Sequence, residues 1–204
     1  MNTQQKPTRR QQQKEDTRRV ILDAAYALFG EKGYAQTTMR TLASRARVGL
    51  GTIFKHFPDK PSLLVAAYQQ DVGKIIVEAS RSLPEAGIKE QLLHITKSIY
   101  GFYAADPSFS RDLIKEALFL KGEDGEILDN QLMAFLKEVA ELLKKAVGNG
   151  ELPADTNVHE GALAFGAFYF AGLIMGLKQS TFNTQEQLQF VEAMIDNHFA
   201  RKNR

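Results

Sequence analysis

TMRTLASRARVGLGTIFKHFPDKPSLL, residues 38–64, carries the most informative pattern in this chain of 204 residues. Apolar residues recur at helical spacing over two short segments, 39–45 and 51–56, and a glycine-containing turn lies between them. Thr38 is a candidate N-cap for the first segment, and Asp59 is one for the longer helix that follows. Two short helices joined by a tight turn form the helix-turn-helix layout, in which the second helix can enter the major groove of DNA.

The residues between these apolar positions are predicted to face outward. Most of them can donate hydrogen bonds to phosphates or base edges, as an element lying in a major groove must. An ordinary helical hairpin with a basic outer face has the same pattern, so the layout alone leaves that alternative open. The outward positions are Arg40, Thr41, Arg47, Leu50, Thr52, Lys55 and His56.

Helical periodicity continues along the rest of the chain, and no run of alternating apolar and polar residues is long enough to predict a sheet. Residues 1–14 are rich in Gln, Arg and Lys without apolar periodicity, which predicts a disordered basic arm. We therefore predict an all-α protein of about nine helices, by summing the periodic segments. Its helix-turn-helix domain spans residues 15–60, and residues 61–204 form a helical bundle that dimerises and binds an effector.

Charge is distributed unevenly. Residues 1–60 hold 12 Lys and Arg against 5 Asp and Glu, whereas residues 61–204 hold 14 against 19. A basic head on an acidic body favours a polyanion as partner, with nucleic acid the first candidate, although a merely solvated basic tail gives the same imbalance. The N-terminus lacks the apolar region of a secretory signal, so we expect a cytoplasmic protein.

Catalytic and metal-binding patterns are missing from the sequence. The chain has no cysteine, which excludes disulfides, thiolate metal sites and cysteine nucleophiles. We find no motif for a serine nucleophile, a zinc protease or a phosphate-binding loop. No second histidine stands at helical spacing from any of the four histidines, although Asp155 lies four residues before His159. We therefore predict no enzyme activity, no metal and no cofactor.

Residues 161–177, GALAFGAFYFAGLIMGL, carry no charge. A membrane span needs about 20 such residues, and a helix that is apolar all round must be buried on every side. We predict that this helix packs on its own subunit with one face and on a second copy with another; a central helix of a monomer is the alternative. The predicted interface residues, from this helix and the last one, are Gly166, Phe170, Leu173, Leu177, Leu188, Val191, Ile195 and Phe199.

Aromatic residues gather in the middle of the chain, where residues 100–170 hold 10 of the 19. Helical bundles place ligand sites between facing helices, so these rings are candidates to line an apolar cavity. For any single ring a packed core remains the alternative. The candidate pocket residues are Tyr100, Phe102, Tyr103, Phe119, Phe135, Phe165, Phe168 and Tyr169.

Residues 18–64 resemble the opening of the tetracycline-repressor-like (TetR) family. The resemblance lies in RVILDAA (19–25), LFGEKGY (28–34) and VGLGTIFKHF (48–57), together with the spaced residues between and after them. It implies a two-fold dimer that is a cytoplasmic transcriptional regulator, with the third helix in the major groove. It also implies that the C-terminal helices hold a small-molecule effector and the dimer interface.

The resemblance assigns roles to residues by position. Arg40 would approach a base edge or phosphate, and Thr52 a phosphate or a thymine methyl group. Two residues depart from the family pattern: Phe54 replaces the usual Tyr, so a hydroxyl contact is lost, and Leu50 replaces a common polar residue, which leaves an apolar contact such as one to a thymine methyl group. The remaining implied phosphate-contacting residues are Gly49, Gly51, Lys55, His56 and Lys60.

The sequence thus predicts a homodimeric repressor that an apolar or aromatic small molecule releases from a palindromic operator. Two other functions remain open. One is a constitutive DNA-binding or architectural dimer without an effector, and the other is a helical enzyme or small-molecule carrier. Specific, salt-dependent DNA binding separates the first two from the third.

Overall fold

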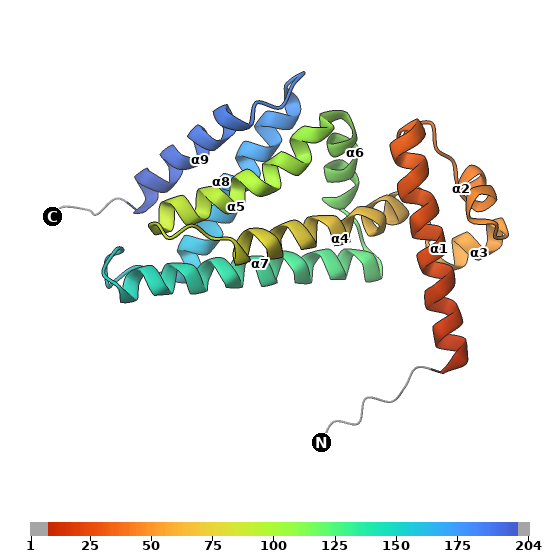
Figure 1. Cartoon of the computed structure of the whole chain (residues 1–204), viewed down its shortest axis with the longest axis horizontal. Helices are drawn as coiled ribbons and strands as arrows, with labels where there is room; N and C mark the ends of the chain where they lie inside the picture. Colours follow the sequence, from red (N-terminus) through yellow and green to blue (C-terminus); the bar gives the residue numbers. More distant parts are fainter. Residues whose placement is uncertain (1–7, 200–204) are drawn as a thin grey trace. The chain divides into compact units, whose positions relative to one another are not determined.

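The computed structural model describes residues 8–199, and over these residues it holds nine helices and no strand (Figure 1). The all-α prediction is therefore confirmed. The helices are α1 (Arg9–Lys32), α2 (Met39–Ala46), α3 (Leu50–His56), α4 (Lys60–Arg81), α5 (Ile88–Ala105), α6 (Pro107–Ala117), α7 (Gly122–Gly148), α8 (Val158–Lys178) and α9 (Thr184–Phe199).

The chain forms two compact units. Among the described residues, the head unit comprises residues 8–69 together with Asp112–Asp124, and the body unit comprises Gln70–Arg111 together with residues 125–199. Helices α4, α6 and α7 each begin in one unit and end in the other. The domain boundary that the sequence predicts at residue 60 thus lies at the start of α4. The division between the two compact units instead falls inside that helix, after Gln69.

Helix α1 begins earlier than predicted. Arg9 is its first residue, and Thr8 caps it: the Thr8 hydroxyl accepts from the Gln11 N–H, and the Gln11 side chain accepts from the Thr8 N–H. This capping box, followed by long unbranched side chains that lose little freedom in a helix, explains why residues 9–14 are helical without apolar periodicity. The predicted disordered arm is wrong for these residues, and residues 1–7 lie outside the described part of the chain.

The two short helices of the head are set by local signals that the sequence displays. The Thr38 side chain caps α2, which ends at Arg47 in the left-handed conformation with φ 55°, and α3 then begins directly after Gly49. Asp59 accepts hydrogen bonds from the N–H and the hydroxyl of Ser62 at 2.8 and 2.6 Å, which fixes the start of α4. The fully buried side chains that hold these helices together are Ile21, Leu42, Ile53, Phe57, Leu63 and Leu64.

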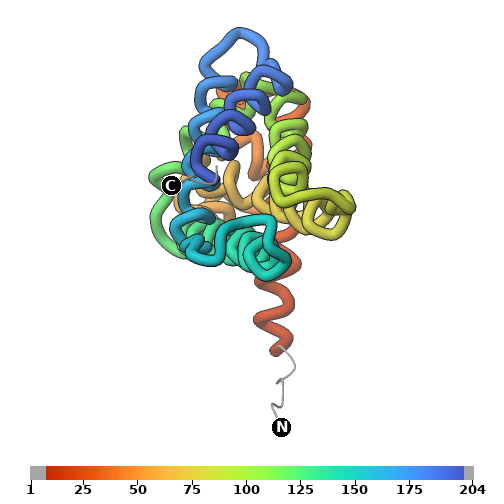
Figure 2. Tube along the Cα trace, turned by 90° about the vertical axis from the view of Figure 1, so that its left-hand side faces the viewer, coloured from red at the N-terminus to blue at the C-terminus, as the bar shows by residue number. Residues whose placement is uncertain are grey.

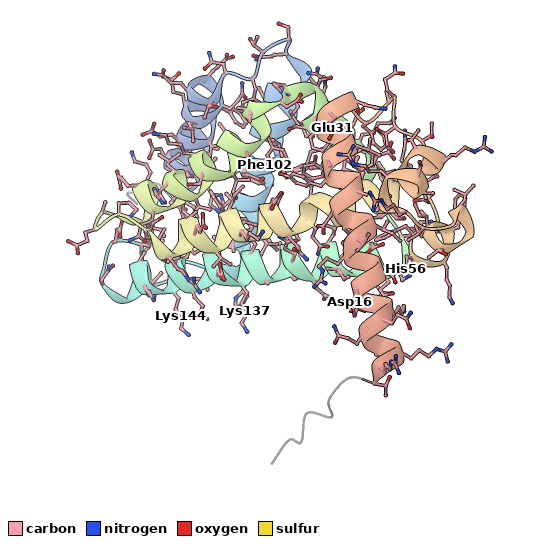
Figure 3. The ribbon with its side chains drawn as sticks, turned by 45° about the vertical axis from the view of Figure 1, so that its right-hand side comes forward. Asp16, Glu31, His56, Phe102, Lys137 and Lys144 are labelled. Atoms are coloured by element: carbon pink, nitrogen blue, oxygen red, sulfur yellow. The ribbon has the colours of Figure 1, made fainter. Side chains whose placement is uncertain are left out.

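In the body unit, α9 packs against α8 and α5, and Figure 2 shows these three helices together. Lys89 of α5 forms ion pairs with Glu192 and Asp196 of α9, both at 3.3 Å, at the edge of this packing. The lysines of α7 labelled in Figure 3, Lys137 and Lys144, are exposed.

Helix α8, whose residues 161–177 carry no charge, is embedded in the body by its glycines. A Cβ added at Gly176 would lie 2.6 Å from the ring of Phe182, and one at Gly166 would lie 2.8 Å from the Leu136 side chain. Atoms do not approach a real Cβ so closely, so these positions leave room for side chains of the same chain. Helix α8 is also the one described helix with the length and apolar composition of a membrane span, a test that a core helix passes as well.

Candidate nucleic-acid interface

Helix α3 presents four exposed residues on one face: Leu50, Gly51, Phe54 and Lys55. Leu50 is 37% exposed and Phe54 is 48% exposed. The opposite side carries Ile53, which is fully buried and anchors the helix in the head. Half-buried Thr52 and His56 lie at the edge of the outward face. Of the outward positions predicted on this helix, Leu50 and Lys55 are exposed, whereas Thr52 and His56 are only half-buried. Among the four exposed residues of the face, Lys55 alone carries a charge.

The preceding helix and turn add further exposed groups. Arg40 and Arg47 are exposed, and Arg47 is held in place by its left-handed backbone at the end of α2. Thr41 is exposed too, but its hydroxyl donates to the Thr38 carbonyl at 2.8 Å and accepts from the Thr38 N–H at 3.0 Å. Thr41 thus helps to cap α2, which no outward-facing pattern could reveal.

Lys60 is tied into the head rather than extended from it. Its Nζ donates to the carbonyl oxygens of Tyr34 and Thr37, at 3.0 and 3.1 Å, and lies 4.0 Å from the centre of the Tyr34 ring. These contacts fix the loop between α1 and α2 on the start of α4. The phosphate contact implied by the family resemblance stays a prediction, and it competes with these bonds for the same ammonium group.

The basic residues of α1 divide into two groups. Arg9, Arg10 and Lys14 are exposed on its first turns. Arg18 instead forms an ion pair with Asp124 at 2.8 Å, and its guanidinium lies 4.7 Å from the centre of the Phe57 ring. Burial raises the pKa of the Asp124 carboxyl, while Arg18 acts in the opposite direction. No local sequence pattern indicates this pair, because its members are 106 residues apart.

His56 ends α3 beside the basic side of α1 (Figure 3). Its Nδ1 is buried and has no hydrogen-bond partner among the residues that the structure describes. Burial lowers the pKa of His56, and the positive charges of Lys14 and Arg18 lower it further. Its surroundings therefore favour the neutral form of the ring, although it belongs to the predicted DNA-binding face.

Tyr34 connects this loop to a segment far along the chain, and the sequence analysis missed it. Burial raises the pKa of Tyr34, as do the nearby carboxylates of Glu116 and Asp112, and its hydroxyl bonds with Glu116. Glu116 lies at the end of α6, in the part of that helix that belongs to the head unit. A loop tyrosine is a common residue, so only the folded chain reveals its partner.

The second predicted site, the aromatic cluster, lies in the body unit with one exception. The rings of Tyr100 and Tyr169 stack at 5.5 Å, and the Tyr100 hydroxyl donates to the Tyr169 carbonyl at 2.6 Å. Phe135 contacts Phe165 and Tyr169, with ring centres 6.3 and 6.2 Å apart. Burial raises the pKa of Tyr103 to about 12. These rings pack against one another as a core.

Phe119 lies apart from that core, whereas Phe168 and Phe102 are half-buried. Phe119 is 83% exposed and belongs to the head unit, so its assignment to a pocket with the other rings is wrong. It follows the last turn of α6, where helical spacing no longer predicts burial. Phe168 packs edge-on against His198, and half-buried Phe102 packs against Tyr103.

The predicted dimer interface also needs correction. Leu173, Leu177, Val191 and Ile195 are buried within the body of a single chain, so they have no surface to offer a second copy. The sequence could not separate the two faces of α8 because that helix is apolar on both. Gly166, Leu188 and Phe199 are half-buried. The exposed apolar residues of α8 are Leu163 at 59%, Ala167, Phe170 at 37% and Met175.

Comparison with known proteins places this head among bacterial regulators. The family model described as "Bacterial regulatory proteins, tetR family" matches residues 21–67, which include α2 and α3. The transcriptional repressor KstR of Mycobacterium tuberculosis is 26% identical over 145 residues, 71% of this chain and 64% of the relative. KstR of Mycolicibacterium smegmatis is 35% identical over 79 residues, 39% of each chain. The chain thus spans less than two thirds of these two relatives.

A solved structure extends the likeness to nearly the whole fold. The transcriptional regulator FadR of Bacillus subtilis, solved in complex with stearoyl-CoA, superposes with a TM-score of 0.66 at 20% sequence identity. The match covers 87% of this chain and 97% of that one. At this identity the likeness concerns the fold, an N-terminal helix-turn-helix followed by a helical domain.

Proposed function

The chain belongs to the TetR family of bacterial regulatory proteins, and we propose that it is a cytoplasmic, sequence-specific DNA-binding transcriptional repressor. The observation that supports this most strongly is the outward face of α3. The head that carries this face also exposes Arg40 and Arg47 and the cations on the first turns of α1. An exposed helix in a head where these exposed cations form no ion pair among residues 8–199 suits a groove whose walls are phosphates.

We propose that the basic residues of the head divide into those that contact DNA and those that contact the protein itself. We assign the contacts to DNA to Arg40, Arg47 and Lys55 together with the exposed cations of α1. Lys60, Arg18 and Arg45 serve the head itself, since Arg45 forms two hydrogen bonds with the Glu31 carboxylate at 2.6 and 3.2 Å. Gly49 and Gly51 keep the backbone at the start of α3 accessible.

We further propose that the chain acts as a homodimer. Helix α8 exposes a stripe formed by Leu163, Ala167, Phe170 and half-buried Ile174, residues that share one face at helical spacing. A two-fold interface uses the same patch on both subunits, and a dimer reads two half-sites of a palindrome. This stripe replaces the buried residues of α8 and α9 as the proposed contact surface.

An apolar or aromatic small molecule is the proposed effector, with its site among the rings of the body unit. FadR, which shares the fold, was solved with stearoyl-CoA, which carries a long apolar chain. The alternative is a dimer that binds DNA without an effector, and the close packing of Tyr100 and Phe165, both fully buried, favours it. Helices α4, α6 and α7 run from one unit into the other, so each is a continuous element through which ligand binding in the body can affect the head.

Selection from random duplexes tests the DNA-binding function. Repeated capture of DNA by the full chain should enrich a palindrome, and Arg40→Ala should lower its affinity. Lack of an enriched sequence would contradict a sequence-specific regulator and favour a helical enzyme or carrier.

A separate experiment tests the effector. We expect at least one compound among long-chain acyl-CoAs and aromatic molecules to raise the melting temperature. By linkage, such a ligand must bind free protein about 5- to 150-fold more tightly than operator-bound protein. Equal affinity for the two forms, or no stabilising compound, would favour the dimer without an effector.

A further inference from the structure

The outward face of α3 offers few hydrogen bonds to base edges. Among its exposed side chains only Lys55 carries a donor, and Leu50, Gly51 and Phe54 carry no hydrogen-bonding group. Proteins that read bases by hydrogen bonds commonly use Arg or Lys on guanine and Asn or Gln on adenine. With a single lysine on this face, most of its contact with a groove floor must be apolar.

Leu50 and Phe54 form one continuous apolar surface, which we call the apolar ridge. Residues four apart in a helix are neighbours on its surface, with Cβ atoms about 5–6 Å apart. Both side chains are exposed, at 37% and 48%, so neither is needed to fill the core of the head.

Gly51 leaves the flank of this ridge open. A Cβ there would meet no atom within 4 Å, and Gly51 is not among the described glycines with positive φ. Neither packing within the head nor backbone conformation therefore calls for glycine at this position. Because Gly51 has no side chain, the surface of a binding partner can approach the backbone of α3 closely at this position.

Charge around the apolar ridge identifies the surface that covers it. Exposed Lys55 follows Phe54 on the same helix, and exposed Arg47 precedes Leu50 by three residues, so the occupant of the ridge is apolar at the centre and anionic at the margins. The major groove of DNA has this character where a base carries a methyl group: phosphates form the walls, and the C5-methyl of thymine is the apolar group on the floor. Cytosine acquires the same group when it is methylated at C5.

We infer that the apolar ridge of Leu50 and Phe54 reads C5-methyl groups, so that the head distinguishes thymine and 5-methylcytosine from pyrimidines without the methyl. This inference rests on the proposed DNA-binding function and names the chemical feature recognised. Burying one methyl group contributes about a fourfold gain in affinity. Four helical residues rise about 6 Å, so the two side chains reach bases about two steps apart.

Uracil substitution tests the inference, because deoxyuridine is thymidine without the methyl group. Each thymine of the selected operator is replaced in turn, and the dissociation constant is measured by fluorescence anisotropy. We expect about a fourfold loss per half-site at one or two positions, and a comparable gain when a cytosine placed there is methylated at C5. In Leu50→Ala or Phe54→Ala these differences should fall to less than twofold at the position that the altered residue contacts.

Lys55→Ala is the matched control on the same face. It should weaken binding to thymine and uracil duplexes alike, so their ratio stays as in the unaltered protein. If a palindrome is selected but uracil leaves its affinity unchanged at every position, or the ratio survives in both ridge variants, the inference is wrong while the DNA-binding function stands. If no palindrome is selected, the proposed function itself fails.

Discussion

Glycines occur on the outward face of α3 and along α8, but their surroundings differ. A Cβ at Gly51 would meet no atom within 4 Å, whereas one at Gly176 would lie 2.6 Å from the Phe182 ring. At Gly172 an added Cβ would collide with the Tyr100 hydroxyl, which bonds to the backbone of α8. The glycines of α8 therefore admit side chains of the same chain, while that of α3 faces open space.

This difference shows where each helix can meet a partner. The glycine face of α8 packs against the core of its own chain. A second copy can therefore reach only the opposite face, where Leu163 and Phe170 are exposed. Helix α3 keeps its glycine on the exposed face, beside the apolar ridge. A small residue permits close approach in both places, and only burial tells whether the approaching surface is internal or external.

The largest effect is expected on the exposed face of α8. Phe170→Glu places two unpaired charges in a two-fold interface, which costs several kcal/mol, so sedimentation should show monomers at micromolar concentration. Asn130→Glu, which adds the same charge at an exposed position of α7, should leave a dimer. An unaltered protein that sediments as a monomer would remove α8 as the interface.

A matched pair of glycine substitutions tests the comparison itself. Gly176→Val overpacks the body against Phe182 and should lower the free energy of unfolding by about 3 kcal/mol in urea. Gly51→Val meets no neighbour, so it should change stability by less than about 0.5 kcal/mol and yet weaken operator binding. Equal losses of stability would show that the two helices do not differ in this way.

Substitutions at Lys60 and at Arg40 should have different effects, the first on the stability of the head and the second on DNA binding. Lys60→Met keeps the apolar stem but removes two charged hydrogen bonds to carbonyls, at a cost of about 1.5–3 kcal/mol in urea unfolding. Arg40→Ala should leave stability within about 0.5 kcal/mol and reduce operator affinity by about 1–3 kcal/mol if Arg40 meets a base edge. A stable Lys60→Met protein that binds DNA poorly would instead make Lys60 a phosphate contact.

The smallest effect concerns pH. The pKa of His56 lies below its ordinary value of 6.5 in the folded head, so between these two values the unfolded chain binds more protons. Its contribution to stability is complete above pH 6.5 and falls as the pH drops toward the folded-state pKa. His56→Gln should show a weaker decline of the urea midpoint over this range. Identical declines in both proteins would contradict a lowered pKa for half-buried His56.

Local signals in the sequence predicted the helices and the outward face of α3. Thr38 and Asp59 cap the helices expected of them, and the spacing of buried Leu42 and Ile53 places Leu50 and Lys55 on the surface. Each of these features depends on residues a few positions apart, which share a face or a turn.

Features that depend on distant partners were not predictable. Arg18 and Lys60 resembled free cations until folding brought Asp124 and the Tyr34 carbonyl to them. Leu173 and Val191 are apolar on helices whose inward face depends on neighbours elsewhere in the chain, so their burial was assigned to the wrong surface. Periodicity identifies an apolar face but not what covers it.

The salt dependence of operator affinity tests the central claim, that the exposed cations of the head bind the phosphates of a specific duplex. If about four phosphates are neutralised by each subunit, log K against log salt should fall with a slope near −7 for the dimer, measured between about 0.05 and 0.2 M salt. The selected palindrome should also bind more tightly than a scrambled duplex at every salt concentration. A slope near zero, or equal affinity for both duplexes, would contradict the account.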